Sequence, residues 1–330
     1  MKIKLPRLRL IISCLFLAST HAISSPVSFN SSKFQTSDII SKIPGTILSI
    51  QEQNSDLFSN ASKQLLITYI SRGTQSEPIV TSGYLLLPKG KAPKEGWPIL
   101  AWAHGTTGVA DTCAPSADYT GGPVHAYQQV AAKALNAWLA RGYAVVAPDY
   151  QGLGTPGGYQ YANIAEYVAS NHQITTDVAA FFPIVLLGAE AADPSLISEN
   201  FVSQDMKAVL DYARKRCLSE LQSDLKAAPK TVFKPNVNLT PLTSYLKKQS
   251  IENMIPSVPV LIIQGDKDQL VDYRGTYAYY EQICKEQKTI AFHPIKNGDH
   301  RDSLRQSEFL IENFTNSVEH GEIINTCISK

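Results

Sequence analysis

Strands and helices alternate at both ends of the chain, and this alternation constrains the fold more than any other feature. A short apolar run at residues 98–103 predicts a buried strand, and apolar residues at helical spacing over 127–139 predict a helix. The apolar run 143–147 predicts the next strand. A strand–helix–strand unit with continuously apolar strands is typical of parallel pairing, because helices cover both faces of such a sheet.

The end of the chain repeats the pattern. Strands are expected at 258–263 and 289–292, with a helix at 273–284 between them. A last helix is expected at about 303–318. We expect that helix to bury three apolar side chains: Leu304, Ile311 and Phe314. Both ends of the chain therefore fit one α/β sheet, mainly parallel and flanked by helices.

The middle of the chain differs from both ends. Two strands are expected early, at 65–70 and 79–87, but residues 160–255 contain few convincing strands. Within this stretch, apolar residues at helical spacing mark an amphipathic helix: Met206, Val209, Leu210, Ala213 and Cys217. We interpret the middle as a helical insertion into the α/β sheet.

The first 22 residues have the pattern of a cleaved secretion signal. Four basic residues and no acid precede an apolar run from 10 to 18, and small residues at Thr20 and Ala22 fit a cleavage site after Ala22. The apolar run is about half the length needed to span a membrane. No later run approaches that length, so we expect no transmembrane segment and a secreted or periplasmic protein.

The charge balance gives no excess of positive charge of the kind that binds nucleic acid. The 330 residues hold 30 Lys+Arg and 29 Asp+Glu. Removal of the four signal-segment bases would leave 26 bases against 29 acids, a net charge of −3. Since 44% of the residues are hydrophobic, the chain can build a sizeable core. The sequence does not predict an oligomeric state.

Four cysteines follow the signal segment: Cys113, Cys217, Cys284 and Cys327. An even number in an exported chain favours two disulfides, and three pairings are open from the sequence. Their spacing matches no zinc motif. We expect no metal and no cofactor.

Three chemically distinctive segments follow predicted strands. Residues 104–108, His-Gly-Thr-Thr-Gly, come after one strand, and a glycine-rich turn there can aim N–H groups at a developing oxyanion. Asp268 follows a second strand, and His300 lies in the loop after the last one. Because sites in open parallel sheets form beyond the carboxyl ends of strands, we predict that Asp268 and His300 are an acid–base pair.

These segments resemble the secretory lipase family of α/β-hydrolases. Residues 101–116 are similar to its oxyanion segment, and 143–157 to the strand and loop that follow. Residues 264–271 resemble its acid turn, with Asp268 at the acid position, and 298–300 its histidine loop. The resemblance covers most of the mature chain.

The resemblance implies a secreted carboxylic-ester hydrolase of lipase or esterase type, acting on acylglycerols or other lipid esters. It implies a single domain over 23–330 with a helical lid at about 173–255, and an oxyanion hole that includes Thr106 and Thr107. It also favours the disulfides Cys113–Cys217 and Cys284–Cys327.

The chain departs from the family at the nucleophile. Such hydrolases carry a serine on a Gly-x-Ser-x-Gly elbow between a strand and a helix, and the sequence contains no such motif. A strand–helix–strand unit needs about 30 residues, so a whole segment, including central strands of the sheet, is missing. The gap is either a real deletion or an artefact of the gene model.

Two residues are weak substitutes for the missing serine. Ser170 is the nearest serine but lacks the flanking glycines. Residues 183–192 could form a strand and an elbow at Gly188 that presents Glu190, or they could be a lid helix. Three hypotheses follow: an impaired ester hydrolase, an active hydrolase with a non-standard nucleophile, or a non-catalytic binder of acyl lipids or of a partner.

Overall fold

The computed structural model describes residues 42–73, 75–159, 179–225, 231–251, 254–322 and 324–327, together with residues 39 and 229. The expected signal segment with its cleavage site after Ala22 lies outside the described residues, as does the candidate nucleophile Ser170. No described helix is long and apolar enough to cross a membrane.

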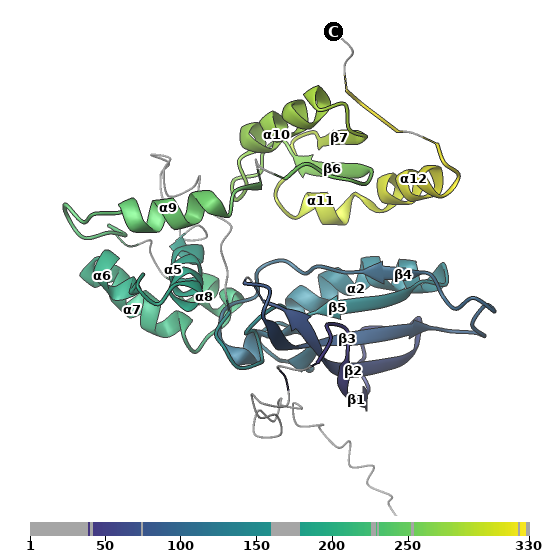
Figure 1. The fold of residues 1–330 in the computed structure, drawn as a ribbon, viewed down its shortest axis with the longest axis horizontal. Helices are drawn as coiled ribbons and strands as arrows, with labels where there is room; N and C mark the ends of the chain where they lie inside the picture. The colour runs from purple at the N-terminus through teal and green to yellow at the C-terminus, as the bar shows by residue number, and fades with distance from the viewer. Residues whose placement is uncertain are drawn as a thin grey trace, which may run out of the picture.

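Five strands near the N-terminus form one sheet in the order β1-β2-β3-β5-β4 (Figure 1). Their bounds are Ile47–Gln53 (β1), Ala61–Arg72 (β2), Pro78–Pro88 (β3), Ile99–Ala101 (β4) and Ala144–Pro148 (β5). The expected mainly parallel sheet is not what this part of the chain forms: β1, β2, β3 and β5 pair antiparallel, and only β4 and β5 pair in parallel. Strand direction differs from the expectation because β1–β3 are joined by short connections, which suit antiparallel neighbours.

The predicted strand–helix–strand unit is present as β4, helix α2 (His125–Ala140) and β5. Two 3₁₀ turns, η2 (Asp111–Cys113) and η3 (Pro115–Ala117), lie between β4 and α2. The helix packs Leu135 and Leu139 against Leu86 and Val145 of the sheet. It ends before Gly142, which has a φ of +84° that favours glycine.

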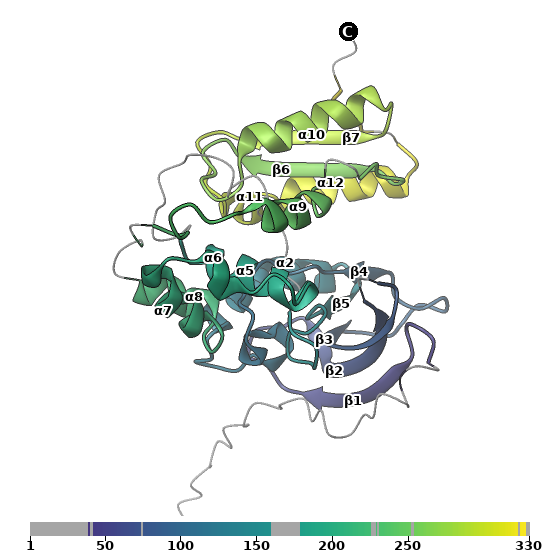
Figure 2. The ribbon, with the colours of Figure 1, turned by 60° about the vertical axis from the view of Figure 1, so that its left-hand side comes forward.

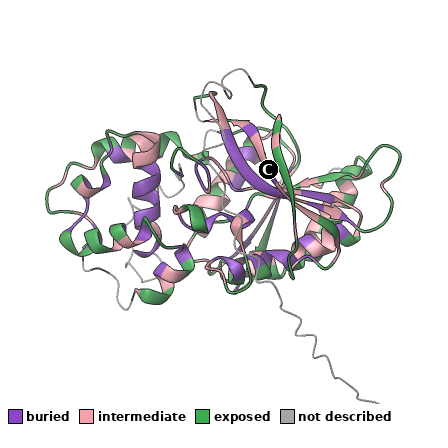
Figure 3. Cartoon of the chain, turned by 90° about the horizontal axis from the view of Figure 1, so that it is seen from below, coloured by how far each residue is buried: buried purple, intermediate pink, exposed green. Residues whose placement is uncertain are grey.

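The described middle of the chain is helical, as expected. It contains α5 (Phe181–Ala192), α6 (Ser198–Phe201), α7 (Gln204–Ala213), α8 (Leu218–Asp224) and α9 (Thr240–Lys248). The face of α7 that carries Met206, Leu210 and Ala213 is buried, and these side chains join a hydrophobic cluster centred on α5. Figure 3 shows buried residues both in this helical group and in the strands of the first sheet.

The C-terminal part forms a second, smaller sheet. Strands β6 (Val260–Gly265) and β7 (Ile290–Ile295) pair in parallel through α10 (Tyr273–Lys285), and α11 (Asp302–Arg305) and α12 (Glu308–Glu319) follow. The outer edge of β7 is covered, because Thr326 donates its N–H to the Ile290 carbonyl and accepts the Phe292 N–H on its hydroxyl. A disulfide between Cys284 and Cys327 fixes this covering segment to α10.

The facing edges of the two sheets have no partner strand. Within the described residues, β4 pairs only with β5, and β6 pairs only with β7. The expected buried strand is therefore only three residues long, and Ile99 in it is 69% exposed. The expectation that central strands are missing stays a prediction, because residues 160–178 lie outside the described residues.

Helix α12 is less buried than the sequence predicts. Leu304, Ile311 and Phe314 are only partly buried, and α12 has no buried residue. The helices α11 and α12 lie between the second sheet and α2 (Figures 1 and 2), where Arg141 donates a hydrogen bond to Asn316 at 2.7 Å. A cavity of about 250 Å³ remains between these helices. No described strand lies under α12 to complete its burial.

We predict that the free edge of β4 makes the chain self-associate. An apolar strand edge exposes unpaired backbone groups that another chain can bind, and a lysine on such an edge opposes this. Ile99→Lys is therefore expected to lower the association constant measured by sedimentation velocity. Phe309→Lys, at an apolar position on α12 with the same 69% exposure, is the control. Equal effects of the two substitutions would contradict an edge-specific association.

Candidate active site

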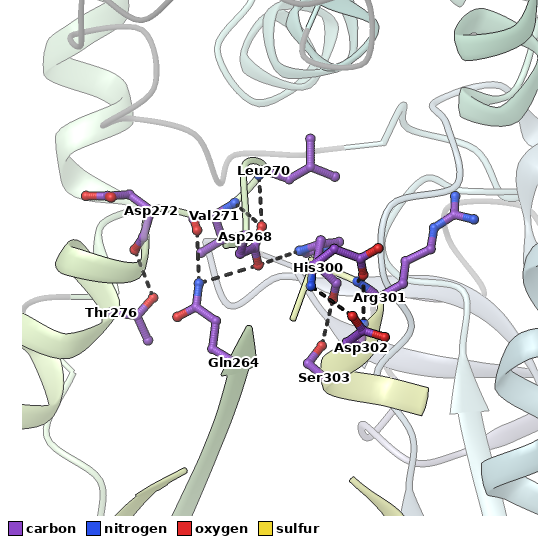
Figure 4. Close-up of polar contacts among 11 residues, drawn as sticks. Gln264, Asp268, Leu270, Val271, Asp272, Thr276, His300, Arg301, Asp302 and Ser303 are labelled. Atoms are coloured by element: carbon purple, nitrogen blue, oxygen red, sulfur yellow. Dashed lines mark hydrogen bonds and ion pairs between the residues drawn. The ribbon is translucent and has the colours of Figure 1, made fainter. Parts of the chain in front are cut away.

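The acid turn after β6 holds Asp268 in a fixed orientation. Its Oδ1 accepts the N–H groups of Leu270 at 2.8 Å and Val271 at 2.9 Å (Figure 4). Its side chain is 3% exposed. Burial alone would raise the pKa of Asp268, but the hydrogen bonds from His300 and from the two backbone N–H groups outweigh burial and lower it. The carboxylate form is therefore favoured.

His300, in the loop after β7, is hydrogen-bonded to this carboxylate. Its Nδ1 lies 2.9 Å from Asp268 Oδ2. Because an ionised carboxylate only accepts hydrogen bonds, Nδ1 must carry the proton, which leaves Nε2 as the basic nitrogen in the neutral ring. The His300 side chain is 45% exposed, and among the described residues Nε2 has no hydrogen-bond partner.

Backbone contacts hold the acid turn and the histidine loop together independently of the two side chains. Asp266 donates its N–H to the Ile295 carbonyl at 3.1 Å, and Lys267 donates to the Gly298 carbonyl at 3.0 Å. Gly265 lies so close to Gly298 that a Cβ at position 265 would overlap the Gly298 carbonyl. The structure therefore brings Asp268 and His300 together, as the sequence predicted, on two loops that backbone hydrogen bonds join.

The expected oxyanion segment is also firmly held. Gly105 donates its N–H to the Tyr127 hydroxyl at 2.6 Å, which excludes Gly105 as an oxyanion donor in this conformation. Tyr150 donates its hydroxyl to the His104 carbonyl at 2.7 Å and stacks on the His104 ring. The backbone carbonyl of Thr107 accepts the N–H of Leu218 at 2.8 Å.

Buried polar atoms after β4 lack partners within the described residues. They belong to the Trp102 indole (Nε1), the His104 ring (Nε2) and the Thr107 hydroxyl (Oγ1). Burial lowers the pKa of His104 and outweighs the backbone hydrogen bonds that raise it, so its neutral form is favoured. Unpaired buried polar groups are costly, and these follow a strand whose outer edge is itself unpaired.

Disulfide Cys113–Cys217 joins this loop to the start of α8 in the helical middle of the chain. Both pairings implied by the family resemblance are confirmed. The glycine at 108 is required here, because its φ is +143° and a Cβ would overlap the Cys113 sulfur. The bond closes a separation of 104 residues. In the chain-entropy model, such a loop closure stabilises the fold by about 4 to 5 kcal/mol.

Asp149 is a buried carboxyl that the sequence did not single out. It follows β5 and accepts hydrogen bonds from the Ser82 hydroxyl at 2.7 Å and the Ser116 N–H at 2.8 Å. Burial raises its pKa to about 6, although these hydrogen bonds act in the opposite direction. Asp149 connects β3, β5 and the loop before α2, so its role here is to fix the loops at the strand ends.

The alternative that Glu190 sits on a strand and elbow is wrong. Residues Phe181–Ala192 form helix α5, and the Ala-rich continuation of the apolar run favours a helix over an elbow. Glu190 accepts the N–H of Ser198 at 3.1 Å and lies 3.8 Å from Arg214. It therefore contributes to the helical insertion as a structural residue.

A second histidine–aspartate pair lies outside the predicted site. His125 Nδ1 is 2.9 Å from Asp118 Oδ2, at the start of α2. Burial raises the pKa of Asp118 despite the hydrogen bond from His125, the opposite of the shift at Asp268. This pair follows no strand end. In the described part of the chain, no group of three or more metal-ligating side chains occurs.

The fold is similar to those of solved lipases and esterases. Lipase A of Candida antarctica in its closed state superposes with a TM-score of 0.68 at 16% identity, covering 91% of this chain and 89% of that chain. The rice cell wall degrading esterase LipA from Xanthomonas oryzae superposes with a TM-score of 0.56 at 14% identity, covering 86% and 99%. At these identities, the likeness concerns the fold.

The family resemblance is narrower and more informative. The "Secretory lipase" family model matches residues 154–307, a segment that contains both Asp268 and His300. The resemblance to secretory lipases is thereby confirmed over these residues. A comparison with curated protein sequences gives no match.

We predict that Asp149 makes stability fall as the pH rises. The pKa of Asp149 is about 6 in the folded chain, against an ordinary value of 3.8 that applies to the unfolded chain. Between these pH values the folded state therefore binds a proton that the unfolded state does not bind. The free energy of unfolding should therefore decrease between pH 4 and 6 by roughly 3 kcal/mol through this group. Urea unfolding of Asp149→Asn should lack this decrease, whereas the exposed Asp211→Asn should retain it. Parallel curves for wild type and Asp149→Asn would contradict the assignment.

We predict that Gly265→Ala separates the acid turn from the histidine loop. The new Cβ must displace the Gly298 carbonyl, and such overpacking typically costs about 1 to 3 kcal/mol. The Asp268–His300 hydrogen bond should weaken, seen as loss of the His300 Nδ1 proton signal in NMR spectra. Gly142→Ala is the control for destabilisation without this contact, since a Cβ there meets nothing and its cost arises only from the φ of +84°. An unchanged His300 signal in Gly265→Ala would refute the role of this contact.

Proposed function

We propose that this chain is of carboxylic-ester hydrolase type, with Asp268 and His300 as the acid and base of its catalytic site. The observation that carries the proposal is the 2.9 Å hydrogen bond between them, made at the ends of two parallel strands. The proposed substrate class is acylglycerols or other lipid esters, a choice supported by the lipase family model and by the fold shared with a lipase and an esterase.

In the proposed chemistry, His300 acts through its free nitrogen. Asp268 holds the Nδ1–H tautomer, so that Nε2 can take a proton from a nucleophile and return it to the leaving alcohol. The exposed imidazole edge is open to a substrate or a nucleophile. The segment with Thr106 and Thr107 would supply hydrogen-bond donors to the oxyanion that develops on the ester carbonyl.

The proposed activity is impaired, because the nucleophile is missing. No Gly-x-Ser-x-Gly occurs in the sequence, Glu190 lies in a helix, and Ser170 lacks the glycines that an elbow needs. Removal of the serine alone from such a triad lowers the rate on the order of a million-fold.

We further propose the organisation that accompanies this activity. The signal segment would direct the chain out of the cytoplasm, where two disulfides are stable. Residues 23–330 would act as a single domain. The helices of about 173–255 would form a lid over an acyl-binding surface, and the disulfide to Cys217 would anchor that lid beside the oxyanion segment.

A non-catalytic role is the second candidate. The observation that favours it is the exposed apolar surface on the unpaired edges, which includes Ile99 on β4 and Val258 before β6. Such surfaces are typical of sites that bind lipid or another protein. In this case the hydrolase frame would bind an acyl lipid or a partner without cleaving it.

We predict that an inserted elbow restores activity. A strand–Gly-x-Ser-x-Gly–helix–strand segment placed between the loop after β5 and α5 should allow labelling by a fluorophosphonate and turnover of short-chain nitrophenyl esters. The natural chain should show neither. His300→Ala should abolish the restored turnover, whereas His125→Ala, which removes the other histidine–aspartate pair, should leave most of it.

The outcomes separate the hypotheses. His300-dependent labelling and turnover by the natural chain would mean that a non-standard nucleophile acts and that the activity is not impaired. A folded elbow-restored chain without turnover would overturn the hydrolase proposal. Fatty-acid binding by the inactive natural chain, measured by calorimetry, would favour the binding role.

A further inference from the structure

Gln264 is a buried amide beside the acid of the proposed site. It is the penultimate residue of β6 and is 5% exposed. Its Nε2 donates to the Val271 carbonyl at 2.9 Å and lies 3.4 Å from Asp268 Oδ2 (Figure 4). Both partners are acceptors, so the amide nitrogen must face them.

The two contacts bind both ends of the acid turn. The Val271 carbonyl is fixed by the same amide that approaches Asp268, and the Val271 N–H already donates to Oδ1 of this carboxylate. Oδ2 is the oxygen that accepts the hydrogen bond from His300. The amide therefore acts on the carboxylate oxygen that orients the histidine.

Packing alone does not account for an amide at this position. Gln264 Oε1 is buried and has no hydrogen-bond partner among the described residues. An unpaired buried acceptor is destabilising, and a leucine of similar volume would avoid it. A glutamine at this position therefore indicates that the hydrogen bonds from its Nε2 compensate for the destabilising, unpaired Oε1.

We propose that Gln264 is a positioning residue, which fixes Asp268 Oδ2 toward His300 by donating to that carboxylate and to the Val271 carbonyl. This inference deepens the proposed function and rests on it for its catalytic meaning. Its geometric content concerns only the Asp268–His300 pair.

The test compares three substitutions in the full chain by NMR spectroscopy, with no need for turnover. Carbon-13 titration follows the ionisation of Asp268, and the exchange rate of the His300 Nδ1 proton reports the hydrogen bond. Gln264→Leu removes the donor, so Asp268 should titrate at higher pH and the proton should exchange about tenfold faster, as for loss of one hydrogen bond.

Gln264→Glu distinguishes positioning from packing, and it also serves if Gln264→Leu does not fold. The new side chain keeps the shape of glutamine but, when ionised, repels Asp268 and donates nothing. This repulsion raises the Asp268 titration whatever the role of Gln264, so exchange of the His300 Nδ1 proton is the discriminating readout for this variant. Positioning predicts that the proton exchanges faster than in wild type in both Gln264→Glu and Gln264→Leu. A packing role predicts wild-type exchange in Gln264→Glu, because the isosteric side chain fills the same space.

Gln128→Leu is the matched control. Gln128 is another buried glutamine with an unpaired Oε1, and it donates to the Pro115 carbonyl at 3.3 Å. Its loss should lower the melting temperature without changing the Asp268 titration or the His300 signal. Wild-type exchange of the His300 Nδ1 proton in Gln264→Glu would overturn the inference while leaving the hydrolase proposal intact, since that proposal is decided by ester turnover.

Discussion

A strand at the centre of a parallel sheet needs a partner on each edge, and the architecture of this chain depends on where that condition fails. Strands β4 and β6 each have one partner in the described residues, and their free edges belong to two different sheets. The consequences extend to the neighbouring elements. Ile99 is exposed, α12 buries no residue, and polar atoms after β4 lack partners. These features share one cause if a strand–helix–strand unit is absent between the sheets.

Each half of the proposed site follows a strand with an unpaired edge, β4 or β6, but is fixed by contacts within its own part of the structure. The acid and the histidine lie within one α/β unit, where backbone hydrogen bonds between the two loops fix them. The oxyanion segment lies in the other sheet, held by the Tyr127 and Tyr150 hydroxyls and by the disulfide to Cys217. If the central segment is absent, as proposed, the nucleophile is absent with it, while these supporting groups keep their contacts.

The sequence predicts this structure best where an element packs against a neighbour that is also close in the chain. The strand–helix–strand unit and the pairing of Asp268 with His300 follow from strand ends, which depend on hydrophobic runs. The disulfide pairing could be predicted only through the family resemblance. The exposure of Ile99 and the only partial burial of Phe314 could not be predicted, because burial depends on neighbouring elements that the sequence pattern does not show. Gln264 was missed because a single polar residue at the end of an apolar strand has no periodicity to mark it.

Two buried aspartates show that the balance between burial and hydrogen-bond partners decides which carboxyl is ionised. Burial raises the pKa of both Asp149 and Asp268, yet only Asp149 ends above its ordinary value. Asp149 receives hydrogen bonds from serine groups, which are neutral, whereas Asp268 receives them from two backbone N–H groups and from a histidine that can carry charge. A charged or chargeable donor stabilises the carboxylate more than neutral donors do. In the proposed site, Asp268 thus sets the tautomer of His300, and the hydrogen bond from His300 in turn favours the ionised form of Asp268.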